Sequence, residues 1–411
     1  MQPTLNPQKL ITKDFLALNA IVFLTYCNVA VFFEFHHYLG TLPINDEWFG
    51  LLIALFSVAV LVIRPIISPL LHPDNAKRWI GISCVWVIVS LLLYNVAHDF
   101  WTMTIVRLLH GAAYVVMATA VVSRLVGGIP RDKSAQAFGL ISVITLLPYA
   151  VVPPILEPLT RWAGGFENML NLSCVLMALS FPLLAMIGTG PSEVEGQPQN
   201  AICWQDVLEN LKDARILSLM VISLVVWTSY TPVFYFLKGQ GEKIGVTNPG
   251  WFFTLSTFAE ISVRLLAGPL FDKLDKSKVL LGSLLWLGFS NLVMAHVSGP
   301  IMFYTMGVVL GLGWGIAMPV LSGLTFDVSE PRFRALNTNL AMEMFQCGFF
   351  VGPLAGGTIL IHSGYATLYY ACAGLLFAGL ATAPVLYGIR ATAWQPANEE
   401  RIWKRKSVRN R

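Results

Sequence analysis

The chain has 411 residues and a formal net charge of +4, and 55% of its residues are hydrophobic whereas only 12% are charged. Soluble globular proteins carry about 25% charged residues, roughly twice that share. One membrane-spanning helix needs about 20 apolar residues. The composition therefore indicates a protein with many membrane-spanning helices. It excludes a secreted enzyme, a fibrous protein and a soluble protein with one membrane anchor.

The N-terminal segment, residues 1–13, is polar and lacks the charged and then apolar pattern of a signal peptide. The first apolar run is therefore expected to remain as a membrane span. The six cysteines form no CxxC pair, and five of them fall in apolar runs. They are interpreted as small buried side chains, so we expect neither a disulfide framework nor a bound metal or other cofactor.

Apolar runs between charged residues and Pro or Gly breaks predict an all-α membrane protein with twelve membrane-spanning helices. The predicted ranges are 15–39, 48–71, 79–97, 101–126, 135–158, 168–188, 215–237, 250–271, 279–297, 301–326, 336–361 and 365–389. The fifth span carries Pro148, Pro153 and Pro154. Membrane helices tolerate proline where neighbouring groups satisfy the freed backbone.

The distribution of Lys and Arg predicts the orientation, because cytoplasmic loops carry the excess of positive charge. With a cytoplasmic N-terminus, 21 of these residues lie on the cytoplasmic side and three, namely Arg161, Lys238 and Lys243, lie in loops on the opposite side. Both termini are therefore expected in the cytoplasm and the chain in the cell's inner membrane. The basic tail is expected to lie on the anionic inner leaflet, with no role in nucleic-acid binding.

An internal repeat with an offset of 200 residues relates the two parts of the chain. The segment 64–72 aligns with 264–272, Gly111 with Gly311, and Pro153 with Pro353. Several matches at one offset, in corresponding spans, predict two pseudo-symmetric six-helix halves. The predicted organisation is an N-terminal half (1–189), a linker (190–213), a C-terminal half (214–390) and a basic tail (391–411).

The segment that follows span eight carries the motif that identifies a family. It contains Gly268, Asp272 and Lys273 in the pattern G-x-x-x-D-[RK], four residues after Arg264. In the first copy Ser68 and His72 replace the Gly and the Asp. The chain resembles the major facilitator superfamily over its whole length, and its drug- and metabolite-efflux branch in particular. The resemblance implies that Arg264, Gly268, Asp272 and Lys273 form a gate, mainly in the C-terminal half.

Two further motifs support the resemblance. Arg107 and Gly111 in span four resemble an R-x-x-x-G motif associated with proton-coupled members, although Arg107 could instead snorkel toward the outer surface. Span eleven contains the complete G-x-x-x-G-P-x-x-G-G motif of antiporters, whereas span five keeps only its proline. The residues of the complete copy are Gly348, Gly352, Pro353, Gly356 and Gly357. An alternative is that these glycines only allow close helix packing.

Carboxylates within spans are candidates for proton coupling, since ionisable residues there are costly without a function. They are Glu34, Glu260 and Glu343, with Arg107 as the facing cation. Glu260 lies one turn before Arg264 and could simply be neutralised by it. Glu343 has no basic residue within a turn of its own helix. Glu34 precedes His36 and His37, but adjacent histidines on one helix diverge, so a metal site is not expected there.

Aromatic residues with polar tips lie beside helix-breaking residues in the central spans, which suits a cavity for a small organic ligand. The predicted cavity residues are Tyr26, Tyr149, Trp227, Tyr230 and Trp314. The alternative is that these rings only pack or lie at the membrane interface.

Three functions fit these features. The first is a secondary transporter that exports a small organic solute, coupled to protons, by alternating access. The second is a proton-coupled uptake symporter for a sugar, an organic acid or a metal chelate. The third is a non-transporting receptor or a membrane enzyme, but no catalytic cluster and no G-x-x-x-x-G-K-[ST] motif for ATP occurs. The expected partners are the lipid bilayer, the solute and protons, and the expected state is a monomer.

Overall fold

The structure is a computed structural model that describes residues 11–71, 73–126, 128, 134–188, 204–271, 274–330 and 333–388. Within these ranges every regular element is a helix. The N-terminal half contains α1 (Lys13–Val31), η1 (Phe32–Glu34), α2 (Phe35–Leu39), η2 (Asp46–Trp48), α3 (Phe49–Ile67), η3 (Ser68–Leu70), α4 (Pro73–Leu93), η4 (Tyr94–Val96), α5 (Phe100–Val126), α6 (Ser134–Ala163), α7 (Phe166–Ala178) and α8 (Ser180–Met186).

The second half follows the same plan after a short helix. It contains α9 (Trp204–Leu211), α10 (Ala214–Lys243), α11 (Trp251–Phe271), α12 (Lys276–Met294), α13 (Pro300–Val328), α14 (Arg334–Gly379), η7 (Leu380–Thr382) and α15 (Ala383–Gly388). Helix α9 lies inside the predicted linker 190–213, whose boundaries stay a prediction. The rest of the linker, the basic tail and residues 1–10 lie outside the described residues.

The described helices account for the twelve predicted spans. Ten segments are long and apolar enough to cross a membrane. One of these, 336–386, holds two spans, because α14 is interrupted at Gly364. Gly364 has φ 79°, a left-handed backbone conformation that glycine adopts without a steric penalty. Helix α11, which is 21 residues long, supplies the remaining span. The prediction of a twelve-helix all-α membrane protein is confirmed.

Most boundaries agree within a few residues, but two helices extend past the predicted ends. Helix α6 continues to Ala163, beyond the predicted end at 158, and α10 continues to Lys243, beyond 237. The sequence placed Lys238 in an outer loop, and this placement is wrong: Lys238 is helical and only 6% exposed. Lys238 has a buried carboxylate partner, which offsets part of the cost of placing its charge in the interior.

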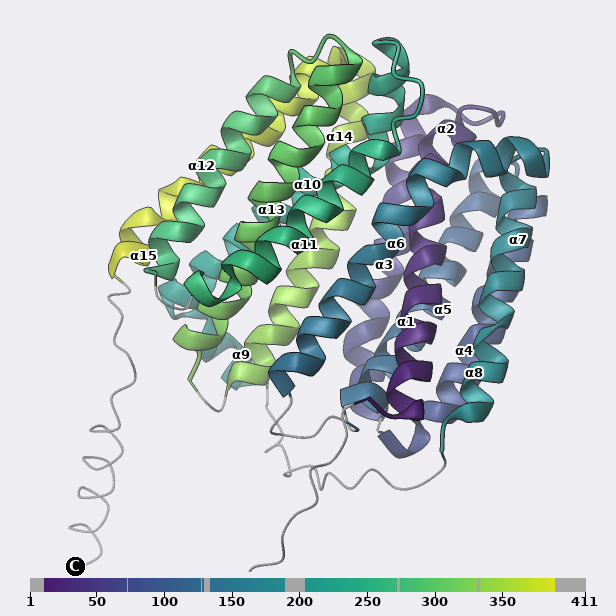
Figure 1. The fold of residues 1–411 in the computed structure, drawn as a ribbon, viewed down its shortest axis with the longest axis horizontal. Helices are drawn as coiled ribbons and strands as arrows, with labels where there is room; N and C mark the ends of the chain where they lie inside the picture. Colours follow the sequence, from purple (N-terminus) through teal and green to yellow (C-terminus); the bar gives the residue numbers. More distant parts are fainter. Residues whose placement is uncertain are drawn as a thin grey trace, which may run out of the picture.

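The two halves lie side by side, with α1 to α8 in one and α10 to α15 in the other (Figure 1). Helix α3 packs against α14 and α6 packs against α11, and α10 also contacts η1 and α2 of the other half. The beginning of α1 and the end of α15 lie at the same end of the molecule, which we call the terminal face. The opposite end carries α2 and the loop 40–45, and we call it the far face.

Two close backbone approaches join the halves at the far face, and they are related by the 200-residue repeat. Gly50 in α3 lies so close to α14 that an added Cβ would be 2.5 Å from the Pro353 carbonyl oxygen. Gly250, at the start of α11, lies equally tightly against Pro153 and Pro154 of α6. The internal symmetry that the sequence suggested is therefore visible as paired contacts between the halves.

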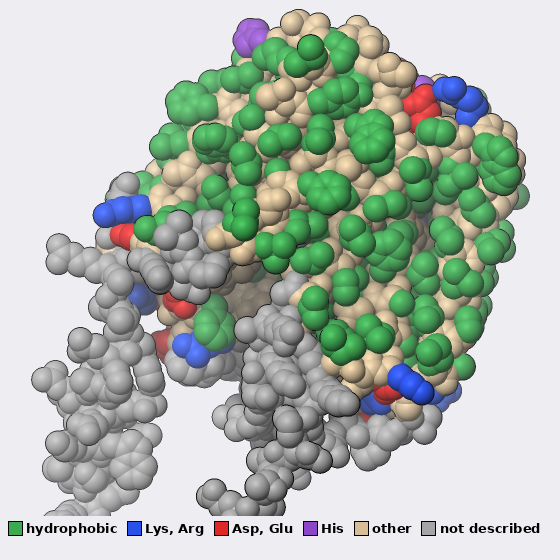
Figure 2. All heavy atoms as spheres, viewed as in Figure 1, with side chains coloured by type: hydrophobic (Ala, Val, Ile, Leu, Met, Phe, Trp, Pro, Cys, Tyr) green, Lys and Arg blue, Asp and Glu red, His purple; other side chains and the backbone are tan. Residues whose placement is uncertain are grey.

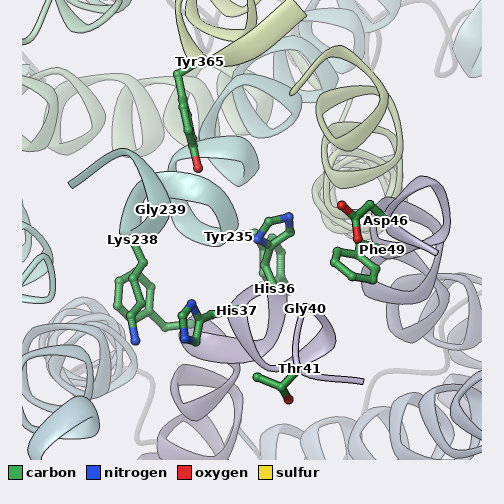
Figure 3. Close-up of a pocket in the computed structure, with 11 residues that line it drawn as sticks. His36, His37, Gly40, Thr41, Asp46, Phe49, Tyr235, Lys238, Gly239 and Tyr365 are labelled. Atoms are coloured by element: carbon green, nitrogen blue, oxygen red, sulfur yellow. The ribbon is translucent and has the colours of Figure 1, made fainter. Parts of the chain in front are cut away.

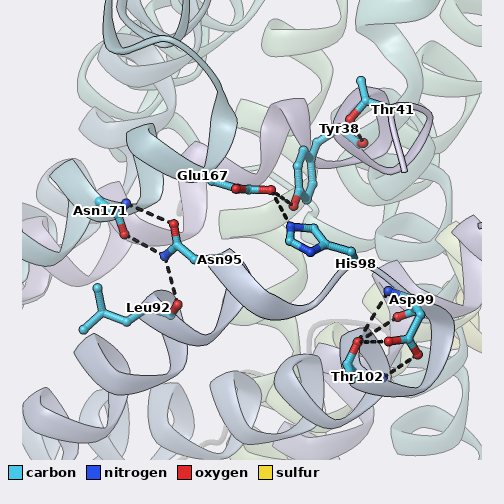
Figure 4. A network of polar contacts seen from close by, with 9 residues as sticks. All are labelled: Tyr38, Thr41, Leu92, Asn95, His98, Asp99, Thr102, Glu167 and Asn171. Atoms are coloured by element: carbon cyan, nitrogen blue, oxygen red, sulfur yellow. Dashed lines mark hydrogen bonds and ion pairs between the residues drawn. The ribbon is translucent and has the colours of Figure 1, made fainter. Parts of the chain in front are cut away.

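Polar contacts tie the far-face ends of the N-terminal half together (Figure 4). The Glu167 carboxylate of α7 accepts a hydrogen bond from Tyr38 Oη at 2.9 Å and contacts His98 Nε2 at 3.0 Å. The Asn95 and Asn171 amides exchange hydrogen bonds of 2.8 and 3.1 Å. These contacts join α2, the α4–α5 connection and α7, and so favour movement of this half as one body.

The outer surface has the character expected of a protein within a bilayer. Apolar side chains cover the middle of the visible face, while charged side chains gather toward its ends (Figure 2). Large side chains such as Trp101, Leu266 and Ile301 are 72%, 83% and 86% exposed. In the same view the surface is recessed between the halves toward the terminal face.

Candidate functional site

A continuous series of aromatic rings crosses the contact between the halves. It begins in the N-terminal half, where the Tyr26 and Tyr149 ring centroids are 6.3 Å apart. The Tyr149 ring then meets Phe234 of α10 at 5.6 Å, with the two planes at 79°. Edge-to-face contacts of this kind are favourable for aromatic pairs. Helices α1, α6 and α10 thus bring rings from both halves into one cluster.

The series continues through the C-terminal half. Phe234 contacts Tyr235 at 4.9 Å, and Tyr235 contacts Phe349 of α14 at 6.3 Å. Phe349 reaches Tyr230, whose ring lies 4.6 Å from that of Trp314 of α13. Trp227 joins the same cluster at 5.5 Å from Tyr230. All five predicted cavity residues therefore belong to one cluster of rings.

Charged side chains from both halves accompany the ring cluster. Glu260 and Arg264 of α11 form an ion pair at 3.4 Å, as the alternative from the sequence anticipated. Arg264 Nη1 also donates a 2.6 Å hydrogen bond to Ser142 Oγ of α6, across the contact between the halves. Tyr230 lies within electrostatic range of both members of the ion pair.

Glu343 of α14 is partly buried and has a cation of the opposite half in its neighbourhood. Arg64 of α3 interacts electrostatically with Glu343 and also with Tyr26. The sequence shows no basic residue within a turn of Glu343 on its own helix. The facing Arg64 was not anticipated, since the two residues are far apart in the chain and lie on different helices.

Arg107 of α5 lies in the interior of the N-terminal half, and it interacts electrostatically with Tyr235 of the ring cluster. Its side chain is 1% exposed, so the alternative that it snorkels to the surface is wrong. Its Nε and Nη2 atoms donate hydrogen bonds of 2.9 and 2.7 Å to the Leu52 and Ile53 carbonyl oxygens. Its guanidinium lies 4.6 Å from the Phe35 ring centroid and 5.1 Å from that of Phe32. These contacts stabilise the buried charge without a carboxylate.

Glu34 lies at the far face and is paired across the halves. Its Oε1 atom is 2.8 Å from Lys238 Nζ of α10, and both side chains are more than nine-tenths buried. Lys238 is also 3.9 Å from Glu242, which in turn is 3.9 Å from His37. Among the described residues no group of three potential metal ligands occurs. The arrangement around Glu34 is thus a set of ion pairs.

The glycines of span eleven lie in close helix contacts. Gly348 packs against Trp227 and Thr228 of α10, Gly352 against Thr231, and Gly357 against Gly50 of the other half. An added Cβ would collide with a neighbour at each of these positions. Close packing, the alternative from the sequence, is therefore present. Of the four predicted gating residues, Arg264 and Gly268 lie in α11, whereas Asp272 and Lys273, like His72, lie outside the described residues.

Two contacts and one electrostatic interaction were missed by sequence reasoning. Lys238 is the partner of Glu34, Ser142 that of Arg264, and Arg64 faces Glu343. Each partner lies on a distant helix of the other half, so no local pattern could have paired them.

Comparison with known proteins agrees with this architecture. A family model described as Major Facilitator Superfamily matches residues 15–247 and 216–410. The multidrug resistance protein MdtG of Klebsiella pneumoniae (strain 342) is 22% identical over 348 residues, covering 80% of this chain and 81% of that protein. MdtG of Escherichia coli (strain SMS-3-5 / SECEC) is 20% identical over 341 residues, covering 80% and 82%.

Solved structures show the same fold. The nucleoside transporter NupG has a TM-score of 0.72 at 16% identity, covering 90% of this chain and 98% of that one. The peptide transporter POT in complex with sulfate has a TM-score of 0.70 at 14% identity, covering 91% and 95%. With a family model that matches both halves, a twelve-helix fold and an internal repeat, the chain belongs to the Major Facilitator Superfamily and is a multi-pass membrane transporter.

Proposed function

We propose that this transporter exports a small, amphiphilic organic solute by proton-coupled alternating access. The observation that carries the proposal is the ring cluster that spans both halves and is flanked by Arg64, Glu260, Arg264 and Glu343. A site built from both halves can be exposed first to one face and then to the other when the halves rock. The protein acts as a monomer in the inner membrane, with the terminal face in the cytoplasm as the 21-to-3 charge bias favours.

The composition of the site favours a solute with an aromatic or apolar body and a polar or charged group. Rings from Tyr26, Tyr149, Trp227 and Trp314 supply apolar and π contacts, and the tyrosine hydroxyls supply hydrogen bonds. The polar group of the solute would be oriented by the guanidinium groups and carboxylates beside the rings, namely those of Arg64, Glu260, Arg264 and Glu343. The name of the MdtG relatives, multidrug resistance protein, supports export of such compounds.

Coupling to protons requires a carboxylate that reaches the central site and changes its charge during the cycle. Glu343 and Glu260 both lie beside the ring cluster, and each has a guanidinium group in its neighbourhood. A proton on either carboxylate would weaken its attraction to Arg64 or Arg264. Since Arg264 also binds Ser142 of the other half, protonation near it would change a contact between the halves.

Uptake by symport remains the second candidate. Span five lacks the glycines of the antiporter motif, with Val152 and Leu156 in their places. The similar solved structures are named as a nucleoside transporter and a peptide transporter. Nucleosides and short peptides are small polar solutes.

The test is solute exchange and gradient-driven transport in proteoliposomes of known sidedness. A panel of labelled aromatic amines, nucleosides and dipeptides would be offered, with and without a pH gradient. Export predicts saturable exchange and, with an acidic far side, movement of solute from the terminal face to the far face. Movement in the opposite direction under the same gradient would establish symport. Absence of saturable exchange for the whole panel would contradict a transporter of such solutes.

A further inference from the structure

We propose that Lys238 and Glu34 form the latch that holds the far face closed, and that Glu34 therefore serves conformational control instead of carrying the coupling proton through the membrane. The inference rests on alternating access, but it depends neither on the direction of transport nor on the solute.

The ion pair joins the two halves at the far face. Glu34 lies in η1, at the far end of α1, and Lys238 lies in the last two turns of α10. The 2.8 Å contact joins the first span of one half to the first span of the other. Lys238 and Glu34 occupy nearly equivalent places in the repeat, so the contact lies close to the axis that relates the halves. A contact there must break whenever the far-face ends separate.

The ion pair is buried beside aromatic rings. The side chains are 8% and 7% exposed, so each charge depends on the other for its stability. The Phe33 ring, next to Glu34, packs against Phe234 and Phe253 at 6.2 and 5.2 Å. These rings pack beside the pair, and Phe234 connects them to the ring cluster. Removing one member of a buried ion pair is strongly destabilising, because the other charge is left without compensation.

Lys238 also lines a cavity. A cavity of about 310 Å³ opens at the far face and is lined by Lys238, His36 and His37 together with Thr41, Asp46 and Tyr365 (Figure 3). Glu242 lies within 3.9 Å of both Lys238 and His37, and Lys243 lies over the Tyr365 ring. Water in this cavity would hydrate Glu34 and Lys238 as soon as they separate. The cost of their separation is thereby reduced only on opening toward the far face.

The role of Glu34 follows from this geometry. With the far face closed, the Glu34 carboxylate is paired with Lys238 Nζ at 2.8 Å. A proton taken up from the far side must leave Glu34 before the pair can re-form, and the cavity returns it to the same side. Glu34 therefore cannot deliver a proton to the terminal face. The coupling proton falls to a carboxylate beside the ring cluster, Glu343 or Glu260.

The test measures how readily the far face opens. A single cysteine is placed at Thr254, a nearly buried residue whose hydroxyl donates to the Ala150 carbonyl across the halves. The six native cysteines are replaced, and a membrane-impermeant maleimide is added from the far side. We expect Glu34→Gln and Lys238→Met each to raise the labelling rate at least about tenfold, because an unpaired buried charge disfavours the closed state.

Two further variants separate a latch from a general loss of stability. The exchanged pair, Glu34→Lys with Lys238→Glu, should return the labelling rate to within about twofold of the parent, since attraction is restored. Substitution of Arg161→Gln, which removes an exposed ion pair with Glu157 on α6, serves as the matched control and should leave the rate unchanged. Cysteines at Glu34 and Lys238 should be joined in the native membrane by a bifunctional maleimide whose spacer matches the two removed side chains, even if a charge variant fails to fold.

The outcomes are decisive. Labelling of both single variants at the parental rate would overturn the proposal, as would an exchanged pair that labels as fast as the single variants. Failure of the cysteine pair to cross-link would do the same. None of these measurements involves solute or a pH gradient, so they stand apart from a failure of the proposed transport function.

Discussion

Charged side chains in the interior have different partners, and the partner determines what each can do. Lys238 and Glu34 compensate each other completely at the far face. Arg107 is compensated by carbonyl oxygens and aromatic rings of its own half, and it also interacts with Tyr235 of the other half. Glu343 is only partly buried and shares its neighbourhood with Arg64 of the opposite half. Of these residues, Glu343 is the one whose charge can change without first breaking a direct ion pair among the described residues.

Glu343→Gln is expected to abolish solute accumulation driven by a pH gradient and to leave exchange at equal concentrations intact. Glutamine keeps the shape of the side chain but cannot bind and release the coupling proton. Both activities would be measured in the same proteoliposomes. Glu157→Gln, near the far-face end of α6, is the control and should retain both activities. If Glu343→Gln still accumulates solute fully, Glu260 becomes the carrier.

Arg107→Lys is expected to lower stability more than it lowers solute affinity. The planar guanidinium donates to two carbonyl oxygens of α3 at once, and a lysine cannot reproduce that geometry. Loss of one charged hydrogen bond and part of the ring contacts should cost about 2–4 kcal/mol. Thermal unfolding of the detergent-solubilised protein measures it, with Arg161→Lys as the exposed control. Unchanged stability together with lost exchange would instead assign Arg107 to the solute site.

Single helices carry the contacts between the halves. Helix α14 lies against α10 within its own half and against α3 of the other half, so glycines on α14 face two neighbours. The span-eleven motif is retained where these close contacts occur. Span five has lost its glycines, and there the close contact is provided by Gly250 of α11 against Pro153.

Gly50→Ala is expected to favour opening of the far face, because its Cβ would collide with the Pro353 carbonyl oxygen on α14. Gly250→Ala should act in the same direction at the symmetry-related contact. Gly282→Ala is the control, since no atom lies within 4 Å of its added Cβ, and it should stabilise α12 by up to about 1 kcal/mol.

Far-side labelling of the Thr254 cysteine would report the effect. Rates of Gly50→Ala and Gly250→Ala equal to that of Gly282→Ala would contradict a role of these crossings in closure.

The sequence was sufficient to predict the twelve-helix fold. Long apolar runs define spans, and the repeat at 64–72 and 264–272 relates the halves, because both features are local or periodic. Contacts between the halves were not predictable. Lys238 follows an apolar run and looks like a loop residue, and its buried partner Glu34 lies 204 residues away in the chain. Arg64 and Glu343 likewise lie far apart in the chain and in different halves, so no local pattern relates them.

In alternating access the two halves move as bodies, so that the far face opens as the terminal face closes. Spin labels at Glu47 and Ser298, both exposed at the far face, and a second pair at Arg124 and Ser322 near the terminal face, would report the two distances by pulsed electron spin resonance. On Lys238→Met substitution, we predict a longer far-face distance and a shorter terminal-face distance. Lengthening of both distances, or no change in either, would contradict alternating access between the two halves.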